Sequence, residues 1–296
     1  MDYGRPVQFG YFPEPHAADP QRVLTEVRAA ERAGLELVGI QDHPYQRAHL
    51  DTWSLLAWLG GQTESITLFP DVVNLPLRPP AMLAKATASL DVLTGGRIEL
   101  GLGAGAFWDA IAAMGGVRKT PGQAVRAVEE AIAVLRLLWA GERSARFEGE
   151  HYQLSGVHPG PRPAHPIGIW VGALGPRMLD LVGRVADGWL PSSSYAPPED
   201  LPEKQERIDA AAMGVGRDPA AIRRLYNISG RITARRTDGF LKGPVEQWAD
   251  ELTGLVLECG VDTFILWPEE PHLDQLALFA DGVVPQVRAQ VAAARA

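Results

Sequence analysis

Short apolar runs alternate along the chain with longer segments in which apolar residues recur every three or four positions. The short runs predict buried strands, and the longer segments predict helices with one apolar face. We expect strands at residues 7–12, 36–41, 66–73, 97–103, 167–172, 188–191, 225–234 and 262–267. We expect helices at residues 20–33, 51–62, 79–93, 121–140, 176–185, 198–213, 244–258 and 273–293.

Eight successive strand–helix units predict an α/β fold with a parallel sheet, and eight units favour its closure into a (β/α)8 TIM barrel. An open doubly wound sheet is the alternative, although an average sheet has about five or six strands. One domain over residues 1–296 is expected. Residues 141–166 are rich in glycine, proline and histidine and are too long for an ordinary connection. We interpret them as an insertion or lid between units four and five.

Composition narrows the class of protein further. Hydrophobic residues make up 46% of the 296 residues and charged residues 22%, which suits a large packed core. The net charge is −8 and no basic run occurs, which argues against a nucleic-acid partner. The single cysteine, Cys259, excludes an intrachain disulfide. The first residues have no signal-peptide pattern and no long apolar stretch occurs, so we expect a cytoplasmic protein with no membrane partner.

The stretch GIQDHP, residues 39–44, places ionisable side chains at the end of a predicted strand. Here a buried strand ends on Asp42 and His43, and Pro44 fixes the chain just beyond. In a barrel of this type the active site lies at the carboxyl ends of the strands. We therefore expect Asp42 and His43 at the site. Asp42, His43, His49 and Asp71 could also be metal ligands, but no further ligand series follows, so a metal-dependent hydrolase is a minor alternative.

Glycines and aromatic residues gather at the other strand ends. The runs at 101–105 and 172–175 follow strands four and five, where backbone N–H groups could bind an anion or the glycines could allow tight turns. Aromatic side chains at these ends would line an apolar cavity suited to a flat ring, or would simply pack in the core. The candidates for the substrate pocket are Phe12, Tyr45, Trp108 and Trp189.

Several stretches together resemble the luciferase-like (bacterial luciferase) family of flavin- and F420-dependent oxidoreductases. They are GIQDHP, the segment ITLFPDVVNLPLRPPAMLAKATASLDVLTGGRIELGLGAG at 66–105, and HPIGIWVGALGPRMLDLVGRVADGWLPS at 165–192. The resemblance implies a barrel, a homodimer and a bound flavin-type cofactor. It implies that Asp71–Val72 is a cis peptide behind the cofactor ring and that Asn74 reaches the ring edge. Further cofactor contacts are implied for Gly105, Ala106, Gly172, Ala173, Leu174 and Gly175.

The resemblance implies two chemistries and leaves both open. With the deazaflavin coenzyme F420, the enzyme would transfer hydride to or from a small organic substrate, and this reading is favoured because an Asp–His pair follows strand two. With FMN, it would be a two-component monooxygenase that uses O2. In either case His43 would sit beside the cofactor, and a flavin or F420 reductase is a conceivable partner. A flavin-binding protein without turnover is the third alternative.

Overall fold

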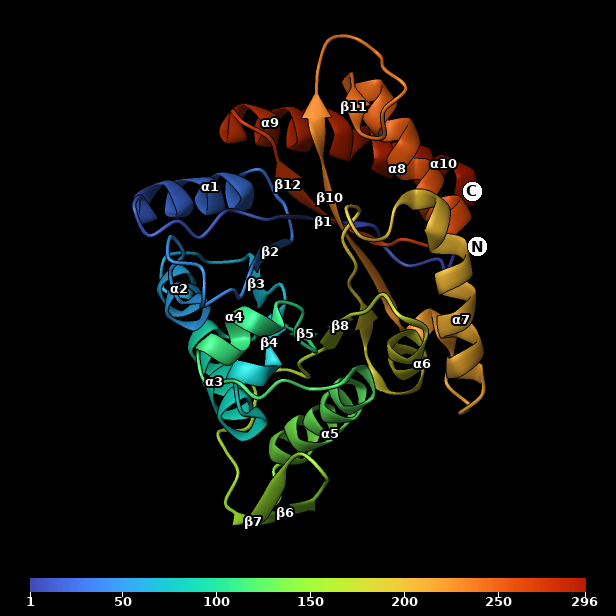
Figure 1. The fold of residues 1–296 in the computed structure, drawn as a ribbon. Coiled ribbons are helices and arrows are strands. Elements are labelled where there is room, and N and C mark those ends of the chain that lie inside the picture. The colour runs from blue at the N-terminus through green and yellow to red at the C-terminus, as the bar shows by residue number, and fades with distance from the viewer.

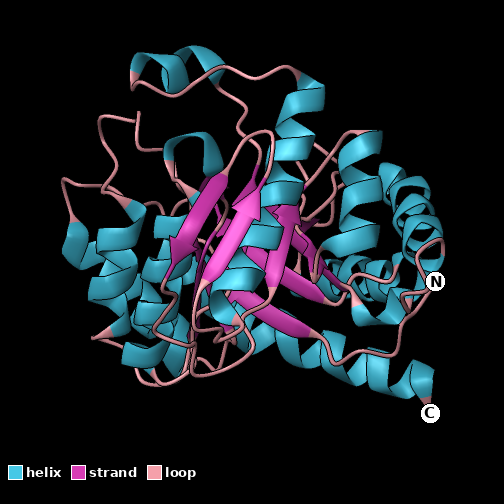
Figure 2. Cartoon of the chain, turned by 90° about the horizontal axis from the view of Figure 1, so that it is seen from below, coloured by secondary structure: helices cyan, strands magenta, loops and turns pink.

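The computed structural model describes residues 1–296, and its centre is a ring of parallel strands enclosed by helices (Figures 1 and 2). Their hydrogen-bonded order is β3-β2-β1-β12-β10-β9-β8-β5-β4. Leu68 in β3 also bridges in parallel to Ile98, just ahead of β5, which closes the ring. The strands are β1 (Gln8–Tyr11), β2 (Leu37–Ile40), β3 (Thr67–Pro70), β4 (Val73–Asn74), β5 (Leu100–Gly103), β8 (Ile169–Gly172), β9 (Gly188–Trp189), β10 (Arg223–Ile232) and β12 (Thr263–Pro268). The predicted (β/α)8 TIM barrel is confirmed.

The third strand differs from its prediction. Residues 66–73 were expected to form one continuous strand, but the chain breaks into β3 and β4 around Asp71 and Val72. The β3 part pairs with β2 and the β4 part pairs with β5. Eight strand positions are therefore filled by nine strand segments, and the break lies at the carboxyl end of the barrel.

A helix follows every strand position, as predicted, with ends that differ from the prediction by a few residues. Proline opens several of these helices, and Asp19, Asp51 and Thr120 cap three of them through side-chain oxygens. The helices are α1 (Pro20–Arg32), α2 (Thr52–Gly60), α3 (Pro80–Thr94), α5 (Pro121–Trp139), α6 (Pro176–Val185), α7 (Leu201–Met213), α8 (Val245–Cys259), α9 (His272–Leu278) and α10 (Val284–Arg295). The last predicted helix is divided, because the π-helical turn Phe279–Val283 lies between α9 and α10.

A short helix, a short strand and a hairpin were not predicted. The short helix α4 (Trp108–Ala113) follows β5, and the two-residue strand β11 (Lys242–Gly243) pairs with β10. The strands β6 (Ala145–Glu148) and β7 (Gln153–Val157) form an antiparallel hairpin within residues 141–166. This hairpin lies beside α5 at the periphery, where Glu130 of α5 accepts backbone hydrogen bonds from residues 150–152 (Figure 1). A lid role for residues 141–166 stays a prediction.

Apolar side chains form two layers, as expected for strands whose side chains alternate between opposite faces. A cluster of 64 buried residues fills the space between the strands and the surrounding helices. A second cluster of 7 residues contains Phe69, Trp170 and Ile265 and lies inside the ring of strands. No helix combines the length and the apolar character that crossing a membrane requires.

Candidate functional site

A cavity of ≈ 580 Å³ lies at the carboxyl ends of the strands. Its walls come from the segments that follow β2, β3, β5 and β8, and from the first turns of α5 and α6. This is the end of a (β/α)8 barrel at which active sites are built. Twelve residues expected at the site line the cavity: Asp42, His43, Tyr45, Val72, Asn74, Gly105, Ala106, Trp108, Gly172, Ala173, Leu174 and Gly175.

His43 lies in the cavity wall between two aromatic rings. Its imidazole stacks on Tyr45 at a centroid distance of 5.5 Å and meets the ring of Phe107 edge-on, also at 5.5 Å. Burial lowers the pKa of His43 below its ordinary value; nearby His49 lowers it further, and Asp42 opposes the shift. The imidazole is therefore neutral at pH 7, and neither ring nitrogen has a hydrogen-bond partner within the protein. Both nitrogens can serve a ligand in the cavity.

Asp42 is fully buried, and its hydrogen-bond partners do not include His43. Its carboxylate accepts two hydrogen bonds from Arg78, each of 2.7 Å, and one of 2.9 Å from the backbone N–H of Asn74. Arg78 also pairs with Asp51, the residue that caps α2. These hydrogen bonds tie the end of β2 to β4 and, through Arg78, to α2, so Asp42 holds the loop in place.

Val72 forms a bulge into the cavity where β3 and β4 separate. The Asp71–Val72 peptide bond is cis, as the resemblance implied. The strand β5 accommodates the bulge with glycines: a Cβ on Gly103 would lie 2.6 Å from Val72 Cγ2, and one on Gly101 would lie 2.2 Å from the carbonyl oxygen of Pro70. These two glycines were expected to bind an anion or to allow a tight turn. The structure shows a third reason, which is close packing against the bulge.

Two buried polar groups flank this bulge. Asp71 lies beneath the cavity and not in its lining; its Oδ1 accepts a hydrogen bond of 3.0 Å from Asn227, while Oδ2 has no partner. Burial raises the pKa of Asp71 to about 7. Asn74 does line the cavity, and its buried Oδ1 has no partner either. Because buried acceptors are nearly always satisfied, the Asn74 oxygen indicates a ligand that donates a hydrogen bond there.

One end of the cavity is suited to an anion. The helices α5 and α6 both begin there, capped by Thr120 and Gly175, and helix N-termini attract negative charge. Lys119 and Arg177 line the same cavity and form no ion pair within the protein. Neither cation was anticipated from the sequence, although each lies within two residues of a proline that opens a helix, which could have been a signal.

Two predicted pocket residues lie elsewhere. Phe12 packs inside the barrel, where its ring stacks on Trp267 at 4.8 Å. Trp189 is 1% exposed and donates its indole N–H to the carbonyl oxygen of Ala173, so it supports the cavity wall from behind. In their place Phe107 contributes an aromatic ring to the lining. No group of three or more His, Cys, Asp or Glu side chains is arranged to hold a metal ion.

Comparison with known proteins agrees with this geometry. The model of the luciferase-like monooxygenase family matches residues 1–239. The chain is 30% identical over 315 residues to the F420-dependent hydroxymycolic acid dehydrogenase of Mycobacterium tuberculosis, covering 90% of this chain and 84% of that enzyme. It is 32% identical over 198 residues to an F420-dependent glucose-6-phosphate dehydrogenase of Nakamurella multipartita, covering 65% of this chain and 58% of that enzyme.

A solved structure extends the comparison to the whole fold. The structure of an F420-dependent secondary alcohol dehydrogenase in complex with an F420-acetone adduct superposes with a TM-score of 0.85. It covers 96% of this chain and 99% of that one, at 19% sequence identity. Since the family model spans most of the chain, this protein belongs to the luciferase-like monooxygenase family.

Proposed function

We propose that this protein is an F420-dependent oxidoreductase that transfers hydride between the deazaflavin and a small organic substrate, with His43 as the group that exchanges the accompanying proton. The observation that carries the proposal is one cavity that joins a neutral imidazole, an apolar wall and a cationic end. The relatives named as F420-dependent dehydrogenases favour F420 over FMN as the ligand.

The residues of the cavity fit such a cofactor. The Val72 bulge offers an apolar surface for a flat ring, and the unpaired Oδ1 of Asn74 offers an acceptor for a ring N–H group. Gly172 and Gly175 leave the backbone accessible near the start of α6. Lys119 and Arg177 would hold the phosphate-bearing side chain of the cofactor, because cations and helix N-termini act together on an anion.

His43 has the properties that proton exchange requires. Oxidation of an alcohol releases a hydroxyl proton, and a neutral imidazole accepts it; in the reverse direction the imidazolium donates it. The lowered pKa keeps the ring neutral and ready to accept a proton at pH 7. Tyr45 and Phe107 hold the imidazole from two sides. Asp42 and Arg78 are positioning residues that fix the segments around it.

Parallel titrations with F420 and with FMN test the proposal. We expect F420 to bind more tightly than FMN. Arg177→Gln and Lys119→Gln should each weaken F420 binding by about tenfold, because each removes one charge-assisted contact. Arg143→Gln is the matched control, because Arg143 is exposed and does not line the cavity. Tighter binding of FMN would favour the two-component monooxygenase instead. Unchanged F420 affinity in both Lys119→Gln and Arg177→Gln would contradict the placement of the phosphate-bearing side chain of the cofactor at these residues.

A further inference from the structure

A second cavity, of ≈ 310 Å³, lies at the opposite end of the barrel and shares no lining residue with the first. It opens where the strands begin: Gln8 starts β1, Thr67 starts β3 and Arg223 starts β10. Trp170, on β8, forms its inner wall. Only 3 of its 12 lining residues are hydrophobic, so it differs in character from the catalytic end.

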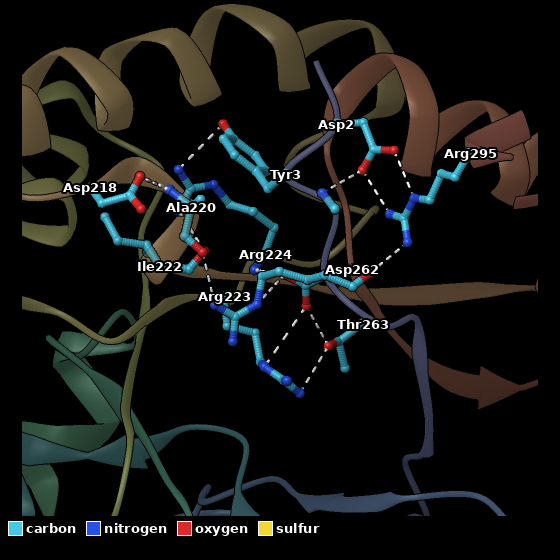
Figure 3. A network of polar contacts seen from close by, with 12 residues as sticks. Asp2, Tyr3, Asp218, Ala220, Ile222, Arg223, Arg224, Asp262, Thr263 and Arg295 are labelled. Carbon is cyan, nitrogen blue, oxygen red and sulfur yellow. Dashed lines mark hydrogen bonds and ion pairs between the residues drawn. The ribbon is translucent and has the colours of Figure 1, made fainter. Parts of the chain in front are cut away.

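Several hydrogen-bond donors around this cavity lack a partner in the protein. The Arg223 guanidinium makes one long hydrogen bond of 3.4 Å to Thr263 Oγ1 and approaches Asp262 only to 3.9 Å (Figure 3). Trp170 is 4% exposed, and it lines the cavity together with Gln8 and Thr67. The side-chain donors of these three residues have no partner within the protein, so they are free to bind a ligand with acceptor atoms.

The acidic residues of the cavity are largely occupied. Glu36 accepts from the backbone N–H of Phe9 and pairs with Arg288, while Asp187 pairs with Arg136. Glu99 accepts from the backbone N–H of Gly168 and lies 3.6 Å from His165 Nε2. Burial raises the pKa of Glu99 to about 7, against the lowering effects of Gly168, His165 and Arg223. Arg5 and Arg223 both line the cavity and both approach Asp262, at 3.4 and 3.9 Å, so one carboxylate faces two guanidinium groups and compensates Arg223 only in part.

We propose that this cavity binds a small monocarboxylate anion, held by the Arg223 guanidinium with the Trp170 indole N–H and the Thr67 hydroxyl as further donors. The fork of a guanidinium matches the two oxygens of a carboxylate. The volume equals that of roughly ten water molecules, which limits the ligand to about ten non-hydrogen atoms. The carboxylates of Glu36, Glu99 and Asp187 around the cavity would oppose a second negative charge, so a dianion such as phosphate is a poorer ligand.

Calorimetric titration of the full-length protein with acetate, isobutyrate and inorganic phosphate, with and without saturating F420, tests this site. We expect saturable 1:1 binding of a monocarboxylate that persists when F420 is bound, because the two cavities share no residue. Arg223→Gln is expected to weaken it about tenfold or more, and Trp170→Phe several-fold with the aromatic ring kept. Arg231→Gln, at an exposed position of the same strand, is the control and should change nothing.

Several outcomes would overturn the site. The first is that neither carboxylate binds saturably at millimolar concentrations. The second is that phosphate binds more tightly than both carboxylates, and the third is that Trp170→Phe leaves the carboxylate affinity unchanged. Thermal unfolding of each variant shows whether it is folded, and Trp170→Phe decides the question if Arg223→Gln does not fold. Failure of F420 to bind would leave this result intact, since the titration without F420 is independent of it.

Discussion

Replacing Asp42 with asparagine should destabilise the protein and weaken cofactor binding together. The substitution removes a buried negative charge that accepts three hydrogen bonds, two from Arg78 and one from the backbone N–H of Asn74. Breaking one partner of a buried ion pair costs about 3–5 kcal/mol. Arg78 keeps Asp51 and its side chain is 20% exposed, so we expect the lower part of that range or less, about 2–3 kcal/mol.

That free energy converts into a measurable shift of the melting temperature. With about 2.1 cal/mol/K per residue over 296 residues, the unfolding entropy is about 0.6 kcal/mol/K, and Tm should fall by about 3–5 °C. Because Asn74 lines the cavity, the affinity for F420 should fall in the same variant. Scanning calorimetry and a fluorescence titration with F420 measure the two effects.

Glu150→Gln is the matched control. Glu150 pairs with Arg126 through the same two-point geometry, at 2.8 and 3.0 Å, but both side chains are half exposed, and neither lines the cavity. Exposed pairs contribute little because water screens them, so Tm and F420 affinity should both stay unchanged. A Tm shift in Asp42→Asn no larger than in Glu150→Gln would refute the view that burial makes the Asp42–Arg78 pair important.

Three further predictions concern the cavity. Gly103→Ala should lower the free energy of unfolding by about 1–3 kcal/mol and weaken F420 binding, because the added Cβ would lie 2.6 Å from Val72 Cγ2. Gly254→Ala in α8, where the added Cβ would have nothing within 4 Å, should not destabilise the protein in the same denaturation assay. The pKa of Asp71 is raised to about 7, so its carboxyl group stays protonated to a higher pH in the folded state than in the unfolded state. Stability relative to Asp71→Asn should therefore fall as pH rises from about 4 to 7, and denaturant titrations at several pH values that show no such fall would contradict it. The acid limb of kcat/KM for substrate oxidation should have its midpoint below the ordinary pKa of histidine, about 6.5, because burial lowers the pKa of His43; a midpoint above it would exclude the neutral ring as the base.

The sequence predicts the barrel well because each strand–helix unit is a local pattern. Apolar spacing, helix-opening prolines and capping residues such as Asp51 and Thr120 all act within a few residues of the chain. The break between β3 and β4 was missed because the run at 66–73 is apolar except for Thr67 and Asp71, and the break depends on glycines about 30 residues away in β5. Such long-range packing leaves no periodic trace in either segment.

The sequence predicted the location of the candidate site better than it predicted the role of each residue there. Strand-end reasoning placed Asp42 and His43 at the carboxyl end of the barrel, the resemblance placed Asn74 there, and all three line the cavity. It could not reveal that Arg78 would bind Asp42, since that pairing joins two different loops. It also placed Trp189 at the cavity, whereas the ring turns behind the wall. Which face of a two-residue strand points inward cannot be read from so short a stretch.

The most direct test follows the absorbance of F420 in wild type and in His43→Ala, at saturating F420. Panels of alcohols are offered with oxidised F420, and carbonyl compounds with reduced F420. The account predicts turnover by the wild type, and unchanged F420 affinity with a rate lower by at least about 10²-fold in His43→Ala, the typical contribution of a general acid–base group. Turnover in His43→Ala equal to the wild type, or a wild type that acts only with reduced FMN and O2, would contradict it.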